Sequence, residues 1–154
     1  MFDYKKGIVG IKDADLGNNV TIIEPANVYD CTIKDNVFIG PFVEVQKGVI
    51  IGEGTRVQSH TFICELVSIG KNCFLGHGVM FTNDLFQSGG PAMGDVSKWK
   101  STNIGNNVSI GSNSTILPVD ICDHVVIGAG SVVTKNISKP GVYFGNPATF
   151  KRDL

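Results

Sequence analysis

The chain has 154 residues, which suits a single domain with a core of its own. Its formal net charge is −1, 18% of its residues are charged and no run of Lys or Arg occurs, which argues against binding to nucleic acid or to an anionic membrane surface. The first ten residues contain no apolar stretch of signal-peptide length, and no later stretch approaches a membrane span. We therefore expect a cytoplasmic protein that is not inserted in a membrane.

The cysteines give no sign of a metal site, because no CxxC pair or other zinc-binding spacing occurs. Without such a pattern, reduced cytosolic thiols are favoured over disulfides, and no metal is expected. The four cysteines are Cys31, Cys64, Cys73 and Cys122.

An aliphatic or other apolar residue recurs at every sixth position along most of the chain. The residue four positions further on is usually small or β-branched, and glycine often follows the leading residue directly. The leading residues are Leu16, Ile22, Val28, Ile33, Ile39, Val45, Ile51, Val57, Ile63, Ile69, Leu75, Phe81, Ile104, Ile110, Ile116, Ile121, Ile127 and Val133.

Six residues per face, with two side chains pointing inward and a tight turn after each face, describe a parallel β-helix of triangular cross-section. Three hexads make one coil, so the repeat predicts about six coils in one all-β domain, residues 1–154, with residues 138–154 as a C-terminal cap. An antiparallel β-sandwich is disfavoured, because its strands alternate with a period of two.

The repeat is irregular only after the third face of a coil, and the longest interruption is a predicted loop at residues 85–103. Loops of this length in a compact domain are usually functional. Because coils stack at the strand spacing, residues at equivalent hexad positions form columns. The columns place Glu65 one coil below Asn83, and Ser59 one coil below His77.

Three segments go beyond the bare repeat: "GHGVMFTND" at 76–84, "SIGSNSTILPVDICDHVVIGAGSVVTKNI" at 109–137 and "PGVYFGNPA" at 140–148. Together they resemble the nucleotide-sugar N-acyltransferase branch of the hexapeptide acyltransferases. The resemblance implies a left-handed coil. It also implies transfer of an acetyl group from acetyl-CoA to the amino group of a UDP- or dTDP-linked sugar, typically a 3-amino sugar destined for surface polysaccharide.

We expect His77, Asn83 and Asp84 to mark the floor of a pocket under the long loop. His77 suits a general base or an orienting group, because imidazole titrates near neutral pH. A substrate contact or a structural turn are the alternatives for His77. Asn83 is the second catalytic candidate, because its side chain can orient the amine by hydrogen bonding, and it also fits a turn. The resemblance implies that Asn83 and Asp84 contact the amino sugar. Glu65 is a further substrate-binding candidate, while Trp99 fits either stacking on a nucleotide base or packing against a neighbouring subunit.

The resemblance implies that coenzyme A lies in a groove between coils of neighbouring subunits, where small residues let it approach the backbone. Turns of the repeat also favour glycine for conformational reasons, so both cofactor binding and turn formation can explain these glycines. The candidate cofactor-binding residues are Gly111, Gly128, Ala129, Gly130, Lys135, Asn146 and Pro147.

The resemblance also implies a homotrimer with sites between subunits. An O-acetyltransferase acting on a sugar or small-molecule hydroxyl is the main alternative. A γ-type carbonic anhydrase is disfavoured, because the three histidines lack the spacing of a zinc site. A structural or ice-binding β-helix is disfavoured, because the chain carries no Thr-x-Thr ladder.

Overall fold

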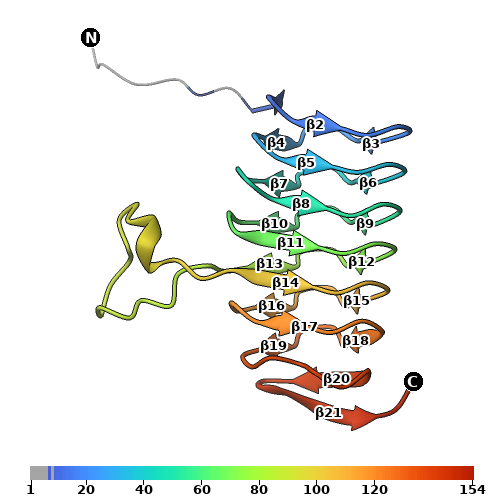
Figure 1. Ribbon diagram of the computed structural model, residues 1–154, viewed down its shortest axis with the longest axis vertical. Helices are drawn as coiled ribbons and strands as arrows, with labels where there is room; N and C mark the ends of the chain where they lie inside the picture. The colour runs from blue at the N-terminus through green and yellow to red at the C-terminus, as the bar shows by residue number, and fades with distance from the viewer. Residues whose placement is uncertain (1–6, 8) are drawn as a thin grey trace.

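The computed structural model describes residue 7 and residues 9–154. It shows the predicted left-handed parallel β-helix: short strands stacked in register along one axis, with a single loop projecting from the stack (Figure 1). The strands form three sheets, which we call faces A, B and C. Face A contains β1 (Ile11–Lys12), β4 (Asn27–Tyr29), β7 (Glu44–Val45), β10 (Phe62–Ile63), β13 (Met80–Phe81), β16 (Thr115–Ile116) and β19 (Val132–Val133).

The chain runs from face B to face C to face A in every coil. Face B contains β2 (Asp15–Leu16), β5 (Thr32–Ile33), β8 (Ile50–Ile51), β11 (Val67–Ile69), β14 (Thr102–Ile104) and β17 (Asp120–Ile121). Face C contains β3 (Thr21–Ile22), β6 (Phe38–Ile39), β9 (Arg56–Val57), β12 (Phe74–Leu75), β15 (Ser109–Ile110), β18 (Val125–Ile127), β20 (Gly141–Gly145) and β21 (Ala148–Arg152).

The stack is longer than the prediction of about six coils, with about seven turns. At the first end, β1 pairs in parallel with β4, although the residues before Leu16 do not keep the six-residue spacing. At the other end, β20 continues face C in parallel with β18, and β21 folds back antiparallel to cover its edge. A covered edge protects the last ladder from pairing with other chains.

The leading residues of the hexads from Val28 onward form the core, as the repeat predicts, whereas Leu16 is exposed and Ile22 is partly buried at the first coil. Ile39, Ile51 and Ile110 are fully buried, and each such side chain contributes about 1.5–3 kcal/mol by leaving water. Polar residues at inward positions are satisfied locally. Thr55, for example, donates from Oγ1 to the Gly70 carbonyl at 2.9 Å and accepts from the Cys73 amide at 3.0 Å.

The long loop spans residues 82–101, so the predicted range of 85–103 begins three residues late and ends two residues late. Thr102 and Asn103 belong to β14 and pair with Val67 and Ser68 of β11. The hexad pattern missed this because the parallel ladder resumes two residues before the next leading residue, Ile104. The loop contains one short 3-10 turn, η1 (Val96–Lys98).

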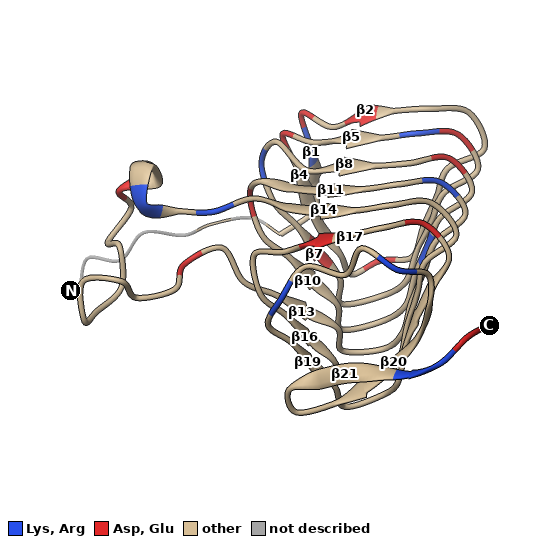
Figure 2. Ribbon diagram, turned by 60° about the horizontal axis from the view of Figure 1, so that its bottom comes forward, with Lys and Arg blue, Asp and Glu red and all other residues tan. Residues whose placement is uncertain are grey.

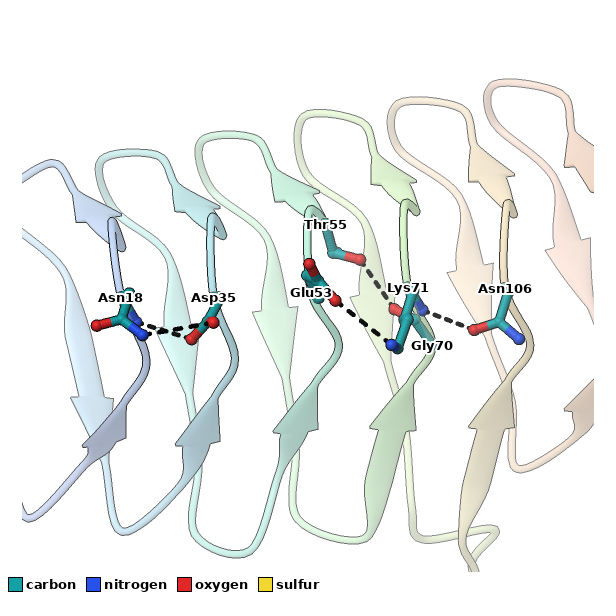
Figure 3. Close-up of polar contacts among 7 residues, drawn as sticks. All are labelled: Asn18, Asp35, Glu53, Thr55, Gly70, Lys71 and Asn106. Carbon is teal, nitrogen blue, oxygen red and sulfur yellow. Dashed lines mark hydrogen bonds and ion pairs between the residues drawn. The ribbon is translucent and has the colours of Figure 1, made fainter.

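Figure 2 shows most charged residues in the turns, while most strand segments carry none. We name the three edges after the faces they join: the A–B, B–C and C–A corners. At the B–C corner, polar side chains tie one coil to the next (Figure 3). Asp35 Oδ1 accepts from the Asn18 amide at 2.8 Å, and Asn106 Oδ1 accepts from the Lys71 amide at 2.9 Å. Among the described residues, no helix is long and apolar enough to cross a membrane.

Candidate functional site

The long loop leaves the A–B corner through a neck that is closed by hydrogen bonds on both sides. The Lys100 amide donates to the Asn83 carbonyl at 2.8 Å, which joins the two ends of the loop. The Asn83 side chain donates from Nδ2 to the Glu65 carbonyl at 3.2 Å, and the Thr102 amide donates to the Leu66 carbonyl at 3.1 Å. Glu65 therefore lies one coil below Asn83, as the hexad columns predict.

Asp84 holds the first half of the loop in place. Its Oδ1 atom accepts from the Phe86 amide at 2.9 Å, and its Oδ2 atom accepts from the Ala92 amide at 2.6 Å. Hydrogen bonds to an ionised carboxylate are stronger than those between neutral groups. Both oxygens of Asp84 thus have a structural function, which the prediction of a substrate contact did not include.

A pocket of about 440 Å³ lies where the loop meets the A–B corner. It brings together four of the predicted site residues with six others. The lining residues are Gln46, Phe62, Cys64, Glu65, Phe81, Thr82, Asn83, Asp84, Phe86 and Trp99.

The lining combines aromatic walls with acidic groups. Phe62, Phe86 and Trp99 supply flat apolar surface, and the two charged lining side chains, Glu65 and Asp84, are both acidic. Among the described residues that line the pocket, none is Lys or Arg. The buried Thr82 Oγ1 atom has no hydrogen-bond partner in the described chain, so a bound molecule or water would satisfy it.

Gln46 connects this pocket to a third acidic residue, Glu44. Its Nε2 atom donates to Glu44 Oε1 at 2.9 Å, and its Oε1 atom accepts from the Glu65 amide at 3.4 Å. Burial raises the pKa of the neighbouring Tyr29, and the negative charges of Glu44 and Glu65 raise it further. Burial also raises the pKa of the Cys64 thiol to about 11, so Cys64 lines the pocket as a neutral group. The region is therefore suited to attract a cation.

His77 lies at a different edge, in the exposed turn of the C–A corner between β12 and β13. Its amide donates to Ser112 Oγ at 3.1 Å, and its carbonyl accepts from the Asn113 amide at 2.8 Å. The Gly78 amide donates to the Ser59 carbonyl at 3.0 Å, which confirms that Ser59 lies one coil below. The imidazole itself stays exposed at the corner.

Most of the predicted cofactor residues gather at the same C–A corner, one and two coils beyond His77. The coils are so close at Gly111 that a Cβ atom there would collide with the Ala129 backbone. Gly128 meets the cap in the same way, because a Cβ atom would lie 2.7 Å from Phe144 Cβ. Gly130 has φ of +68°, a conformation that favours glycine.

The turn of the C-terminal hairpin, which contains Asn146 and Pro147, is tied to this corner. The Gly145 amide donates to Ser131 Oγ at 3.2 Å, and Ser131 Oγ donates to the Gly128 carbonyl at 2.6 Å. Lys135 is the exception among the predicted cofactor residues. It lies exposed at the A–B corner after β19, two coils beyond Asn83 in the same column, so one chain does not bring it to the glycines.

The expectation that His77, Asn83 and Asp84 share the floor of one pocket is wrong for a single chain. His77 does not line the pocket, and it is separated from Asn83 by the full width of face A. Six residues of extended chain span about 20 Å. Both residues are close to the root of the loop in the sequence. However, His77 precedes β13 and Asn83 follows it, so the two residues lie at opposite corners of face A.

Sequence reasoning missed six residues that line the pocket: Gln46, Phe62, Cys64, Phe81, Thr82 and Phe86. Three of them were open to prediction, since Gln46, Cys64 and Thr82 each follow a leading residue on face A and form one column. Phe86 had no such signal, because it lies in the loop outside the repeat. Among the described residues, no three His, Cys, Asp or Glu side chains are grouped so as to hold a metal ion.

Family comparisons agree with the repeat. A model of the bacterial transferase hexapeptide (six repeats) matches residues 30–65, and a model of the hexapeptide repeat of succinyl-transferase matches residues 66–80 and 102–135. The bifunctional protein GlmU of Streptococcus uberis is 35% identical over 137 residues, which cover 88% of this chain and 27% of that protein. The chain thus spans about a quarter of the length of this curated relative.

Two solved structures share the fold. One is a mutant of AntD, an N-acyltransferase from Bacillus cereus, in complex with dTDP and coenzyme A: TM-score 0.80, 23% identity, 92% of this chain and 84% of that chain. The other is the hexapeptide-repeat acetyltransferase VCA0836 from Vibrio cholerae with acetyl coenzyme A: TM-score 0.64, 21% identity, 90% of this chain and 69% of that chain. The two repeat models together match more than half of the residues, so the chain belongs to the hexapeptide-repeat transferase family.

Proposed function

We propose that the chain transfers an acetyl group from acetyl-CoA to the amino group of a UDP- or dTDP-linked amino sugar, most simply a 3-amino-deoxyhexose for surface polysaccharide. The observation that carries the proposal is the pocket at the A–B corner. The Glu65 carboxylate can accept a hydrogen bond from an amino group, and the aromatic walls suit the apolar face of a sugar or a nucleotide base. The fold shared with an N-acyltransferase solved with dTDP and coenzyme A supports this substrate class.

The proposed reaction forms one bond and breaks one. The neutral amine attacks the thioester carbonyl, a C–N bond forms, the C–S bond breaks, and coenzyme A leaves as the thiol after it gains a proton. Glu65 attracts the amino group, and Asn83 fixes the wall beside it through its bond to the Glu65 carbonyl. His77, exposed at the C–A corner, is the group available to accept the proton that the amine loses.

The donor half of the proposed site is the C–A corner. The close approach of coils at Gly111 and Gly128 leaves a path without side chains, along which the pantetheine arm can reach backbone groups. Ala129 and Gly130 continue this path, and the hairpin turn with Asn146 and Pro147 lies at its end. When bound, acetyl-CoA supplies the acyl group, and the C–A corner holds the thioester in position.

The two halves of the site require a second copy of the chain. The acceptor pocket and the donor corner flank face A, about 20 Å apart, whereas reacting atoms must approach to about 3–3.5 Å. A ring in which face A points towards the symmetry axis brings the A–B corner of one subunit beside the C–A corner of the next. This arrangement supports a homotrimer. It also brings Lys135, at the A–B corner of one subunit, beside the donor corner of the next subunit.

The test is a thiol-release assay with acetyl-CoA and a panel of UDP- and dTDP-linked sugars that carry a 3-amino, a 4-amino or only hydroxyl groups. We expect turnover on one amino sugar, with a product that gains the mass of one acetyl group. Release only with hydroxyl acceptors would replace the proposal with O-acetylation. If the acceptor is a hydroxyl, the His77→Ala variant should be inactive at every pH. If the acceptor is an amine, the same variant should regain activity at high pH, where the amine is neutral.

A further inference from the structure

Two exposed aromatic residues stack on each other at the C–A corner, on the N-terminal side of His77. Phe42 and His60 lie in consecutive coils, with ring centroids 4.9 Å apart and planes inclined by 27°. Phe42 is 58% exposed and His60 is also exposed. The pair lies outside the acceptor pocket and outside the group of cofactor-binding candidates.

Both residues occupy a left-handed backbone position, which His tolerates better than Phe does. Phe42 has φ of 60° and His60 has φ of 64°, in the left-handed region. In the next three coils the same corner position is occupied by Gly78, Asn113 and Gly130, the residue types that tolerate this conformation. The left-handed conformation costs Phe42 about 1–2 kcal/mol, so an exposed aromatic residue at this position, stacked on His60, indicates a function for the surface that the pair forms.

The loop exposes an apolar surface of its own. Met93 is 88% exposed and Val96 is 61% exposed, in a loop that is hydrogen-bonded internally by Asp84 and by the Asp95 cap of η1. The loop leaves the stack at β13 and returns at β14, but in Figure 1 it turns back towards the N-terminal coils, so that η1 lies level with β8 to β11. His60, in the turn between β9 and β10, belongs to the coil that begins with β8.

We propose that Met93 and Val96 of the long loop dock on the Phe42–His60 pair of a second copy of this chain. The two surfaces lie at different corners of one chain, so they cannot meet within it. Rotation about an axis parallel to the long axis of the stack does not change the height of a residue along that axis. Such a rotation therefore brings η1 of one subunit to the height of His60 of the next. Two different patches that fit each other are what a closed ring requires.

Docking gives the proposed site its second wall. The loop carries Trp99 and Asp84 of the acceptor pocket, so a loop fixed on the neighbour places that pocket beside the neighbour's His77, one coil from His60. The inference rests on the proposed function in one respect, the need for a second copy to complete the site.

The first experiment cross-links two different chains. A tagged Val96→Cys chain and an untagged His60→Cys chain are co-expressed, and the native protein is treated with a short bismaleimide. We expect a cross-linked heterodimer on a denaturing gel. The matched control replaces His60→Cys by Glu53→Cys, an exposed residue of the same coil at the B–C corner, and the unsubstituted chain measures any background from Cys122. Equal yields for His60→Cys and Glu53→Cys, or no product, would overturn the proposal.

The second experiment measures assembly by sedimentation. Met93→Asp/Val96→Asp and Phe42→Ala/His60→Ala should each weaken association at least about tenfold, because each removes apolar contact area from the same interface. If Phe42→Ala/His60→Ala leaves the stability of the trimer unchanged but raises KM for the nucleotide sugar, the aromatic pair binds the nucleotide instead, and docking is refuted. Cross-linking without acetyl transfer would leave docking intact and refute the proposed reaction.

Discussion

At the B–C corner, Asp and Asn side chains of one coil accept amide hydrogens from the coil before it, as with Asp35 and Asn18 or Asn106 and Lys71. At the A–B corner, the Asn83 side chain also bonds to the preceding coil, but as a donor to the Glu65 carbonyl, and the backbone there opens into a loop of twenty residues, 82–101. The direction of the side-chain hydrogen bond is therefore reversed between the two corners, while its partner belongs to the preceding coil at both. The comparison teaches that the corner bonds keep the coils in register whether or not the chain between them makes an excursion.

Asn83→Ala should have the largest effect, because this side chain holds the neck of the loop to Glu65 and lines the pocket. We expect kcat/KM for the amino sugar to fall about 100-fold, since a misplaced wall separates the reacting atoms. Steady-state kinetics of the thiol-release reaction would measure it. A variant with normal kinetics would show that the neck does not shape the pocket.

Asp84→Ala should release the loop without unfolding the coils. The amides of Phe86 and Ala92 lose their acceptors, so their hydrogen exchange should speed up while exchange in β11 and β14 stays unchanged. We expect KM for the acceptor to rise about tenfold. Asp84→Asn, which keeps one acceptor oxygen, should be intermediate, and an Asp84→Ala enzyme with unaltered exchange would contradict the role of Asp84 as a clamp.

Asn106→Ala sharpens the contrast from the other corner. It removes the acceptor for the Lys71 amide and the 3.2 Å bond from Asn106 Nδ2 to Asp123. The loss should reduce the free energy of unfolding by about 1 kcal/mol and Tm by about 2–4 °C. Activity should stay at the level of the unchanged chain, and a large loss of activity would mean that the two corners are coupled.

The smallest expected effect is the acid response of the B–C corner. The Asn106 amide and side chain lower the pKa of Asp123 below its ordinary value of 3.8. The stabilisation from ionised Asp123 is therefore complete above pH 3.8 and is lost as pH falls through the lowered pKa. The difference in Tm between the unchanged chain and Asp123→Asn should be constant near neutral pH and shrink below pH 3.8. A difference that grows on acidification would contradict this assignment.

The fold could be predicted almost entirely, because each coil obeys a local rule. A buried aliphatic residue such as Ile39 or Ile110 opens each face, and stacking then fixes the columns, including Glu65 beneath Asn83. The ends of the stack were harder, because β1 and β20 pair with the ladder without the hexad spacing.

The site could be predicted only in part. The residues of the pocket that belong to columns were open to inference, whereas the bonds from Asp84 to the Phe86 and Ala92 amides depend on a loop path that no repeat constrains. His77 and Asn83 are only one hexad apart in the sequence. In the triangular cross-section, one hexad spans a full face, so the two residues lie at different corners.

The closed neck between the Asn83 carbonyl and the Lys100 amide makes the segment between them interchangeable in principle. The ladder from β11 to β14 needs only the two ends of the neck, so evolution or a protein engineer can exchange residues 84–99 without disturbing any other coil. Such an exchange would replace Asp84, Phe86 and Trp99 while leaving the glycine corner untouched. Under the proposed function, the acceptor preference would be inherited with this one segment, and an exchange that keeps Met93 and Val96 would preserve the proposed docking surface.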